Sequence, residues 1–268
     1  MITNNKTKVY ISISKYPGNT GSLLHNNGYK MLNLNCIYIP FKCRNDAELK
    51  LFLNNENFKG ISVSMPFKSK VIKFLNKIDN SSKKSGAVNT VIRFKKKLIG
   101  FNTDFFAFKK IIKLKKFNIK NCLLLGNGST SKTSYEVLKE LKVKKIYLSS
   151  RNKKKYKFWK IRKNDVILNW AKRNFLMLDL LINCTPIGMK HINNTPVKLT
   201  NNNQYKYIID FPINKKSKLS FLAKKNNITY VSGLEISLYQ GIEQFKIYTD
   251  KKLSVNNIKK KLNYNFNV

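Results

Sequence analysis

The sequence predicts an α/β fold of two domains, the second of which contains a parallel sheet covered by helices. Three observations support this. The chain has 268 residues, which at roughly 150 residues per domain is enough for one large or two modest domains. Short apolar runs alternate along it with segments of helical periodicity. The run 122–125 is apolar at every position, which is typical of a strand buried on both faces of a parallel sheet.

The first hundred residues alternate strand and helix signals. The predicted elements are, in order, a strand at 9–13, a turn-rich loop at 15–21, a helix at 22–32, a strand at 37–39, a helix at 46–53, a strand at 60–64 that Pro66 stops, and a helix from about Ser69. Strands at 87–93 and 98–101 then flank three lysines and predict a hairpin.

A second unit begins near Phe105. Its predicted elements are a helix at 105–114, the strand 122–125, a helix that reaches about Leu141, and strands at 145–149, 179–183 and 207–210. The segment 152–173 is ambiguous, and we interpret its Trp159 and Trp170 as packing residues. The tail from 233 to 268 is helical in pattern, with a break near 250–254.

The chain is strongly basic, with 53 Lys and Arg against 13 Asp and Glu and a net charge of +40. Five of these are arginines, namely Arg44, Arg93, Arg151, Arg162 and Arg173. Specific nucleic-acid readers use arginine forks and localised patches, whereas the lysines here are spread along the whole chain. We therefore interpret the charge as coding bias and expect no specific nucleic-acid partner. An apolar content of 42% excludes a disordered polycation.

Cysteine and histidine usage argues against disulfides and metals. The four cysteines form no C-x-x-C pair, and the two histidines lie in no metal-ligand cluster, so we expect reduced thiols and no metal site. Residues 1–8 lack the apolar stretch of a signal peptide, and no run reaches the roughly 18 apolar residues of a membrane span. We expect a cytoplasmic protein without a membrane partner. The sequence leaves the oligomeric state, including a homodimer, open.

A nucleotide-binding pattern follows the apolar strand 122–125. Gly126-x-Gly128-x-x-Ser131 opens a helix, which is the context that a dinucleotide fingerprint requires. Gly126 permits the tight turn and Gly128 a close approach of backbone to pyrophosphate, while the helix N-terminus offers free N–H groups. A plain strand–turn–helix can use the same glycines.

The end of the next strand favours NADP over NAD. A cofactor with a free ribose 2′-OH usually meets an acidic residue there. This chain instead has Ser150-Arg151-Asn152 followed by Lys153–Lys155. The Arg151 guanidinium can pair with a 2′-phosphate or stack on adenine.

Three runs in the first half place polar side chains at strand ends. They are V-S-M-P-F-K at 63–68, S-G-A-V-N-T at 85–90 and G-F-N-T-D at 100–104. Lys68, Asn89 and Asp104 suit a polyhydroxylated substrate, because an ammonium–carboxylate pair can hold a hydroxyl and move its proton during hydride transfer. Each run alone is compatible with a structural turn.

Together these motifs resemble the shikimate dehydrogenase family over nearly the whole chain. The resemblance continues through N-C-T-P-I-G-M at 183–189 and G-L-E-I-x-x-x-Q at 233–240. It implies a substrate-binding domain made of 1–104 and 236–268, and an NADP-binding Rossmann domain at 105–235. It also implies NADP-dependent reduction of 3-dehydroshikimate to shikimate, in the pathway to chorismate and the aromatic amino acids.

The resemblance also implies residue roles. Lys68 would be the catalytic acid/base and Asp104 its partner. The implied substrate contacts are Ser64, Asn89 and Gln240. The implied cofactor contacts are Gly126, Asn127, Gly128, Ser129, Thr130, Ser150, Arg151, Asn152, Lys155, Ile208 and Gly233.

The sequence departs from the family pattern at two places, and at both it resembles the shikimate dehydrogenase-like branch of the family. Where the family has a serine pair for the substrate carboxylate, this chain has Asn19-Thr20-Gly21-Ser22. Candidate carboxylate donors are therefore Asn19, the hydroxyls of Thr20 and Ser22, and backbone N–H groups at Gly21, with Ser22 also a candidate helix cap. Where the family tends to have Tyr two residues before a Pro, this chain has Asp210.

Three alternatives stay open. A quinate/shikimate dehydrogenase-like enzyme of altered substrate preference would share the chemistry. A methylene-tetrahydrofolate dehydrogenase would share the two-domain plan but not the joint Lys68, Asn89 and Asp104 pattern. A basic RNA-binding protein could keep the fold without the activity.

Overall fold

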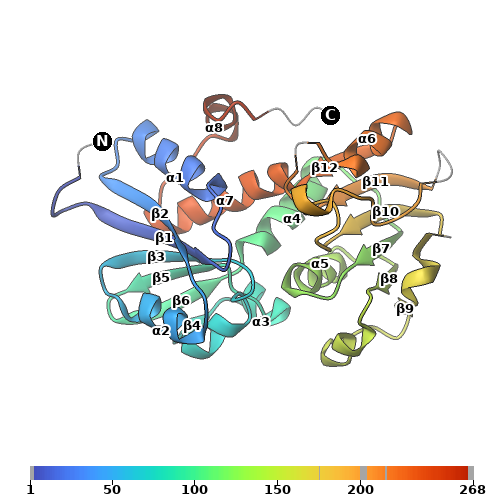
Figure 1. The fold of residues 1–268 in the computed structure, drawn as a ribbon, viewed down its shortest axis with the longest axis horizontal. Coiled ribbons are helices and arrows are strands. Elements are labelled where there is room, and N and C mark those ends of the chain that lie inside the picture. Colours follow the sequence, from blue (N-terminus) through green and yellow to red (C-terminus); the bar gives the residue numbers. More distant parts are fainter. Residues whose placement is uncertain (1–2, 175, 200–203, 215, 265–268) are drawn as a thin grey trace. The chain divides into compact units, whose positions relative to one another are not determined.

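The computed structural model describes residues 3–174, 176–199, 204–214 and 216–264 and divides into two compact units (Figure 1). The first unit holds the described residues up to Ala107 together with Ser237–Tyr264, and the second holds Phe108–Ile236. The chain leaves the first unit within α4 (Thr103–Leu114) and returns to it within α7 (Gly233–Thr249). The predicted α/β class is confirmed.

The first unit is built on a mixed sheet of order β2-β1-β3-β5-β6-β4. Its strands are β1 (Lys8–Ser14), β2 (Cys36–Lys42), β3 (Phe58–Val63), β4 (Lys77–Ile78), β5 (Thr90–Phe94) and β6 (Lys97–Phe101). Strand β1 runs parallel to β2 and β3, whereas β5 is antiparallel to β3 and β6, as the predicted hairpin requires.

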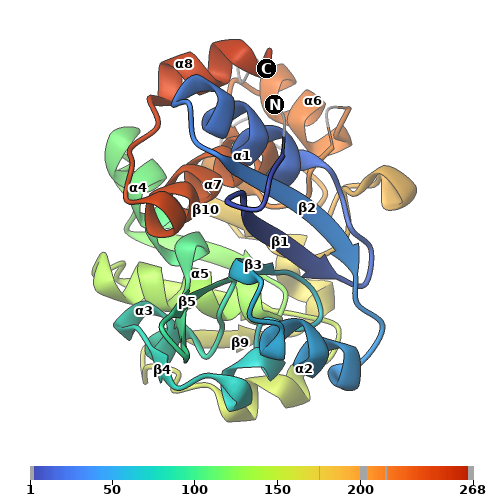
Figure 2. The same cartoon turned by 90° about the vertical axis from the view of Figure 1, so that its left-hand side faces the viewer.

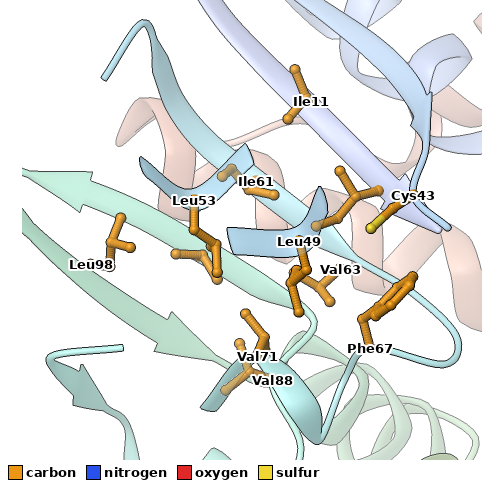
Figure 3. Packing of buried hydrophobic residues seen from close by; sticks show 12 residues of the cluster. Ile11, Cys43, Leu49, Leu53, Ile61, Val63, Phe67, Val71, Val88 and Leu98 are labelled. Atoms are coloured by element: carbon orange, nitrogen blue, oxygen red, sulfur yellow. The ribbon is translucent and has the colours of Figure 1, made fainter. Parts of the chain in front are cut away.

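Strand alternation assigns the two faces of this sheet to different partners. On one face, Ile11, Ile61 and Val63 pack against Leu49 and Leu53 of α2 (Asp46–Asn54), as Figure 3 shows. The opposite face meets α1 (Thr20–Met31) and α7. There Tyr10 stacks on Tyr248 with ring centroids 4.8 Å apart.

Gly60 of β3 makes room for that contact, because a Cβ at Gly60 would lie 2.6 Å from the Tyr248 ring. Helix α8 (Val255–Lys261) then packs beside α1 on the same side (Figure 2).

The first unit differs from the local predictions at two places. The helix predicted from Ser69 is a 3₁₀ helix, η1 (Lys70–Phe74), of five residues, because the chain turns away again into β4. A further helix, α3 (Asn80–Ser85), lay unrecognised in a polar stretch; Asp79 caps it by accepting from the N–H groups of Ser81 and Ser82.

The second unit contains an entirely parallel sheet of order β12-β11-β10-β7-β8-β9. Its elements are β7 (Asn121–Leu125), α5 (Ser129–Glu140), β8 (Lys145–Ser149), η2 (Lys153–Phe158), β9 (Val166–Leu168), η3 (Trp170–Asn174), β10 (Leu178–Asn183), η4 (Lys190–Ile192), β11 (Tyr205–Asp210), α6 (Lys218–Lys225) and β12 (Thr229–Ser232). Strand order reverses between β7 and β10, and ligands bind at the carboxyl ends of the strands at such a switch point.

Both tryptophans of this unit pack against neighbours, as predicted. Trp159 contacts Tyr135 and Tyr156, with ring centroids 5.7 and 5.0 Å away, and the Arg173 guanidinium lies 4.1 Å from the Trp170 ring centroid.

The described residues bear on four further expectations, which concern the tail, the cysteine thiols, membrane spans and metal sites. Helices α7 and α8 fill the tail with the predicted break between them, and its last residues, 265–268, lie outside the described part. All four cysteines are free. Within the described ranges, no helix is long and apolar enough to cross a membrane, and no three His, Cys, Asp or Glu side chains gather as a metal site would require.

Candidate functional site

An ammonium–carboxylate pair joins two of the predicted motifs of the first unit. Lys68 Nζ donates to Asp104 Oδ2 at 2.6 Å, and each side chain is 14% exposed. Lys68 follows β3, and its carbonyl accepts from Val88 N at 2.8 Å; Asp104 stands in the first turn of α4. The two motifs that carry these residues are therefore adjacent in space. A partly exposed pair of this kind can bind a hydroxyl and exchange its proton.

The carboxamide of Asn89 has a fixed orientation. Its Oδ1 accepts from Thr103 N at 2.8 Å, Thr90 Oγ1 at 2.9 Å and Thr103 Oγ1 at 3.1 Å. The side-chain nitrogen Nδ2 forms no hydrogen bond to a described residue. Asn89 is thus held by its oxygen and keeps both amide hydrogens for a ligand.

Two further predicted substrate contacts, Ser64 and Gln240, lie on segments that reach Asn89 through hydrogen bonds to its carbonyl. Ser64 is exposed and begins the loop after β3, where Val63 N donates to the Asn89 carbonyl at 2.8 Å. Gln240 is half-buried on α7, one turn before Gln244, which contacts the Asn89 carbonyl. The side chains of Ser64 and Gln240 form no hydrogen bond within the described residues.

The predicted carboxylate loop turns into helix earlier than expected. Helix α1 begins at Thr20, so Gly21 lies inside it and does not form a turn. Ser22 is not a cap; its Oγ donates to the Asn19 carbonyl at 2.9 Å. Asn19 is the N-cap residue and is exposed, and its side chain makes no capping bond. The first helical hydrogen bond runs from Leu23 N to the Asn19 carbonyl, so the N–H groups of Thr20, Gly21 and Ser22 have no partner within the helix.

The turn after β7 has the form that a pyrophosphate requires. Gly126 has φ +105°, and a Cβ there would lie 3.0 Å from the Cys184 carbonyl oxygen. Gly128 caps α5 with nothing within 4 Å of where its Cβ would be. Ser131, in the place of the third glycine, is buried and donates to the Gly126 carbonyl at 2.6 Å. Backbone can thus approach a phosphate at Gly128, ahead of the N–H groups of Ser129 and Thr130.

The segment after β8 leaves Arg151 free. Asn127 Nδ2 donates to Ser150 Oγ at 3.0 Å and to the Asn152 carbonyl, and Ser150 Oγ also donates to that carbonyl at 3.1 Å. These bonds fasten the segment to the glycine turn. The Arg151 and Lys155 side chains are exposed and have no hydrogen bond to a described residue. The residues present therefore fit a cofactor that carries a 2′-phosphate.

Two predicted cofactor contacts differ in their surroundings. Ile208 is completely buried and belongs to the core around Leu123, Leu181 and Leu219, so its side chain has no surface for a cofactor and the structure argues against this role. Gly233 opens α7 where a Cβ would lie 2.3 Å from the Phe211 carbonyl oxygen, so no larger residue fits there.

Asp210 is a buried anchor at the end of β11. Its oxygens accept from Asn183 Nδ2 at 2.7 Å, Tyr230 Oη at 2.8 Å and Ser217 Oγ at 3.2 Å. Burial raises its pKa to about 6, and these three hydrogen bonds oppose the rise. Asn183 in turn donates to the Ile187 carbonyl at 2.8 Å, so Asp210 holds the loop beside the glycine turn. Asp210 is therefore a structural residue.

Sequence reasoning missed several residues that hold the predicted ones in place. Thr90 and Thr103 bond to Asn89, and Tyr156 Oη donates to the Gly126 carbonyl at 3.0 Å. Gln244 contacts Thr90 as well as the Asn89 carbonyl. One signal was available for Gln244, because it lies one helical turn from Gln240 on the same face.

Comparison with known proteins agrees with this geometry. Residues 19–91 match the family model described as the shikimate dehydrogenase substrate binding domain. A relative from Clostridium botulinum named shikimate dehydrogenase (NADP(+)) is 36% identical over 81% of this chain and 86% of its own. One of the same name from Methanococcus vannielii is 32% identical over 88% and 89%.

Solved structures give the same picture. The shikimate dehydrogenase of Aquifex aeolicus matches with a TM-score of 0.84 and 26% identity, covering 98% of this chain and 100% of that one. A shikimate 5-dehydrogenase-like protein matches with a TM-score of 0.83 and 25% identity over 97% of both chains.

Proposed function

The chain belongs to the shikimate dehydrogenase family, and on this basis we propose that it interconverts shikimate and 3-dehydroshikimate with NADP(H), using Lys68 and Asp104 as its acid/base pair. The observation that carries the residue assignment is the 2.6 Å contact between Lys68 Nζ and Asp104 Oδ2 in a partly exposed position. When bound, NADP⁺ would serve as the hydride acceptor.

The chain's own residues handle the proton and the alcohol. Oxidation of a CH–OH group removes a hydride from carbon and a proton from oxygen. In this proposal Lys68 and Asp104 together hold that hydroxyl and take up its proton. In the reverse direction, negative charge grows on the ketone oxygen, and the Lys68 ammonium both stabilises it and donates the proton.

Asn89 and Ser64 support binding in this proposal. The Asn89 Nδ2 group donates to a second substrate hydroxyl, because its Oδ1 is already occupied by Thr90 and Thr103. Ser64 adds an exposed hydroxyl, one residue after the Val63 N–H that donates to the Asn89 carbonyl. Several fixed donors around a ring of hydroxyls orient a polyol for reaction at one carbon.

The cofactor preference rests on Arg151. Its side chain is exposed just after β8 and has no hydrogen bond to a described residue, and the relatives named above are NADP(+) enzymes. We assign it to the 2′-phosphate, with Gly126–Thr130 at the pyrophosphate. A cytoplasmic location and the absence of a specific nucleic-acid partner belong to the same proposal; the four free cysteines support the location.

The test is turnover of shikimate with NADP⁺, followed by NADPH absorbance, in the native protein and in Lys68→Ala. We expect native activity and a loss of about 10²–10⁴-fold in kcat for the variant, the usual size of an acid/base contribution. Affinity for NADP⁺ should stay unchanged, because Lys68 is not in the cofactor-binding unit. A fully active Lys68→Ala would contradict the assignment, and activity on quinate alone would favour the quinate/shikimate dehydrogenase-like alternative.

A further inference from the structure

Gln244 is a polar side chain in the core of the first unit, and the proposed reaction gives it no role. It lies on α7, is 2% exposed, and has both its oxygen and its nitrogen engaged within the unit, so we do not place it in contact with substrate. Its carboxamide reaches three other parts of the unit: His25 on α1, Ser62 on β3, and Asn89 with Thr90 at the start of β5. A buried carboxamide is costly unless it is paired, and this one is paired on both its oxygen and its nitrogen.

The partners settle which way these hydrogen bonds run. A backbone carbonyl only accepts, so the atom of Gln244 that faces the Asn89 carbonyl at 3.3 Å is Nε2. The oxygen Oε1 therefore faces His25 Nε2 at 3.0 Å, and that ring nitrogen carries the hydrogen. Burial lowers the pKa of His25 to about 3, so the ring is neutral.

The same direction continues to the proposed substrate contact. Gln244 Nε2 donates to Thr90 Oγ1 at 2.8 Å, the shortest of its contacts. Asn89 Oδ1 can only accept, so the Thr90 hydroxyl, which accepts from Gln244, donates its own hydrogen onward to Asn89 Oδ1 at 2.9 Å. A one-way chain thus runs from His25 through Gln244 and Thr90, and it ends by supplying hydrogen to the oxygen of Asn89. That leaves Nδ2 as the end of Asn89 that meets a ligand.

We propose that Gln244 is a positioning residue, which acts through Thr90 to keep the carboxamide of Asn89 turned with Nδ2 toward a substrate hydroxyl. The inference rests on the proposed role of Asn89. Thr103 also bonds to Asn89 Oδ1, so loss of Gln244 loosens the carboxamide without reversing it. The expected effect is therefore that of one neutral hydrogen bond, about 5- to 10-fold.

The first experiment replaces Gln244 by Met, which has a similar length and no hydrogen-bonding amide. We expect KM for shikimate to rise about 5- to 10-fold, with KM for NADP⁺ unchanged and kcat changed less than KM. Thr90→Val and Thr90→Ser form a matched pair at the next link. Val keeps the shape and loses the hydroxyl, so it should reproduce the Gln244→Met effect, whereas Ser keeps the hydroxyl and should restore near-native KM.

The decisive measurement is a double-mutant cycle with Asn89→Ala. If Gln244 acts through Asn89, then adding Gln244→Met to Asn89→Ala should raise KM by less than about twofold further. An equal, additive effect in both backgrounds would overturn the proposal while leaving the role of Asn89 intact. An Asn89→Ala protein with native kinetics would instead overturn the substrate assignment itself, and this proposal with it.

A stability control separates positioning from general loosening. Leu49→Ala removes a completely buried side chain in the same unit, on the opposite face of the sheet (Figure 3). Its melting temperature should fall at least as far as that of Gln244→Met, with KM for shikimate unchanged. An equal rise of KM in Leu49→Ala would show that any destabilisation of the unit has this effect and would overturn the proposal.

Discussion

The buried carboxylate of Asp210 should make the stability of the second unit depend on pH. It is completely buried, and it accepts hydrogen bonds from Asn183, Ser217 and Tyr230, all of which are neutral. No cationic side chain contacts it among the hydrogen bonds and ion pairs of the described residues. Ionisation of Asp210 therefore costs free energy that the neighbours offset only in part.

The sign and size of the effect follow from the pKa. Burial raises the pKa of Asp210 from 3.8 to about 6 in the folded protein. A pKa raised on folding means that the folded state holds the proton more tightly. Its contribution to stability is fully present below about pH 4 and is lost as pH rises through about 6. A rise of about 2 units corresponds to roughly 3 kcal/mol, at about 1.4 kcal/mol per unit.

Asp210→Asn removes this titration. Asn can keep the shape and accept from Asn183, while the hydroxyls of Ser217 and Tyr230 turn to accept from its nitrogen. The two tryptophans of the chain, Trp159 and Trp170, both lie in the second unit, so urea unfolding followed by their fluorescence reports on that unit. Relative to the native protein, Asp210→Asn should gain about 2–3 kcal/mol between about pH 4 and pH 7.

Asp165 is the matched control. Burial alone would raise the pKa of this carboxylate, but hydrogen bonds from Arg162, Tyr135 and the Ile146 N–H bring it below its usual value. Asp165→Asn should therefore lose stability relative to the native protein as pH rises from the acid range, the opposite sign. A difference between native and Asp210→Asn that stays constant over this pH range would refute the reasoning.

Three further predictions concern the ligand sites. Arg151→Ala should weaken NADP⁺ binding by about 1.5–3 kcal/mol in calorimetry and leave NAD⁺ binding unchanged, because the variant loses only its contact to the 2′-phosphate, which NAD⁺ lacks. Equal losses for both cofactors would contradict the assignment, and so would a similar loss in the exposed control Arg44→Ala. Gly126→Ala should weaken both cofactors and lower the melting temperature, because φ is +105° and the added Cβ lies 3.0 Å from the Cys184 carbonyl; unchanged binding would show that this turn does not meet the pyrophosphate. Asn19→Ala should raise KM for shikimate more than it lowers kcat, since the carboxylate is held alike in ground and transition states. Shikimate methyl ester should bind poorly and respond little to Asn19→Ala, so an equal response of ester and acid would remove Asn19 from carboxylate recognition.

Strands and the contact between Lys68 and Asp104 were predictable because their signals are local. The run 122–125 is apolar at every position, so its burial does not depend on which segment packs against it, and it forms most of strand β7. The motifs around Lys68 and Asp104 contain the ammonium and the carboxylate themselves, and in the structure Lys68 Nζ lies 2.6 Å from Asp104 Oδ2. Boundaries were less secure. A helix was expected to start at Ser22, but Thr20 and Gly21 already adopt helical geometry, with Asn19 as the cap.

The supporting polar network could not be predicted, because its partners come from distant parts of the chain. Gln244 bonds to residues 219, 182 and 154 positions away, on α1, β3 and β5. The local sequence puts Gln244 on the same helix face as Gln240, but it does not show which of the two carboxamides is buried and paired. Only the order of strands in the sheet decides that Ser62 and Thr90 face the helix that carries it.

Asp104 and Asp210 show the same point for charge. Each comes at the end of an apolar strand or just after one, so their sequence contexts look alike. Asp104 meets an ammonium at 2.6 Å and keeps 14% of its side chain exposed, which suits a group that exchanges a proton with a ligand. Asp210 meets only neutral donors and is completely buried, so it anchors a loop at a cost in stability above its pKa. Both residues are carboxylates that follow a strand, so neither feature separates them. Tertiary structure supplies their different partners, and these partners make Asp104 a candidate catalytic group and Asp210 a structural anchor.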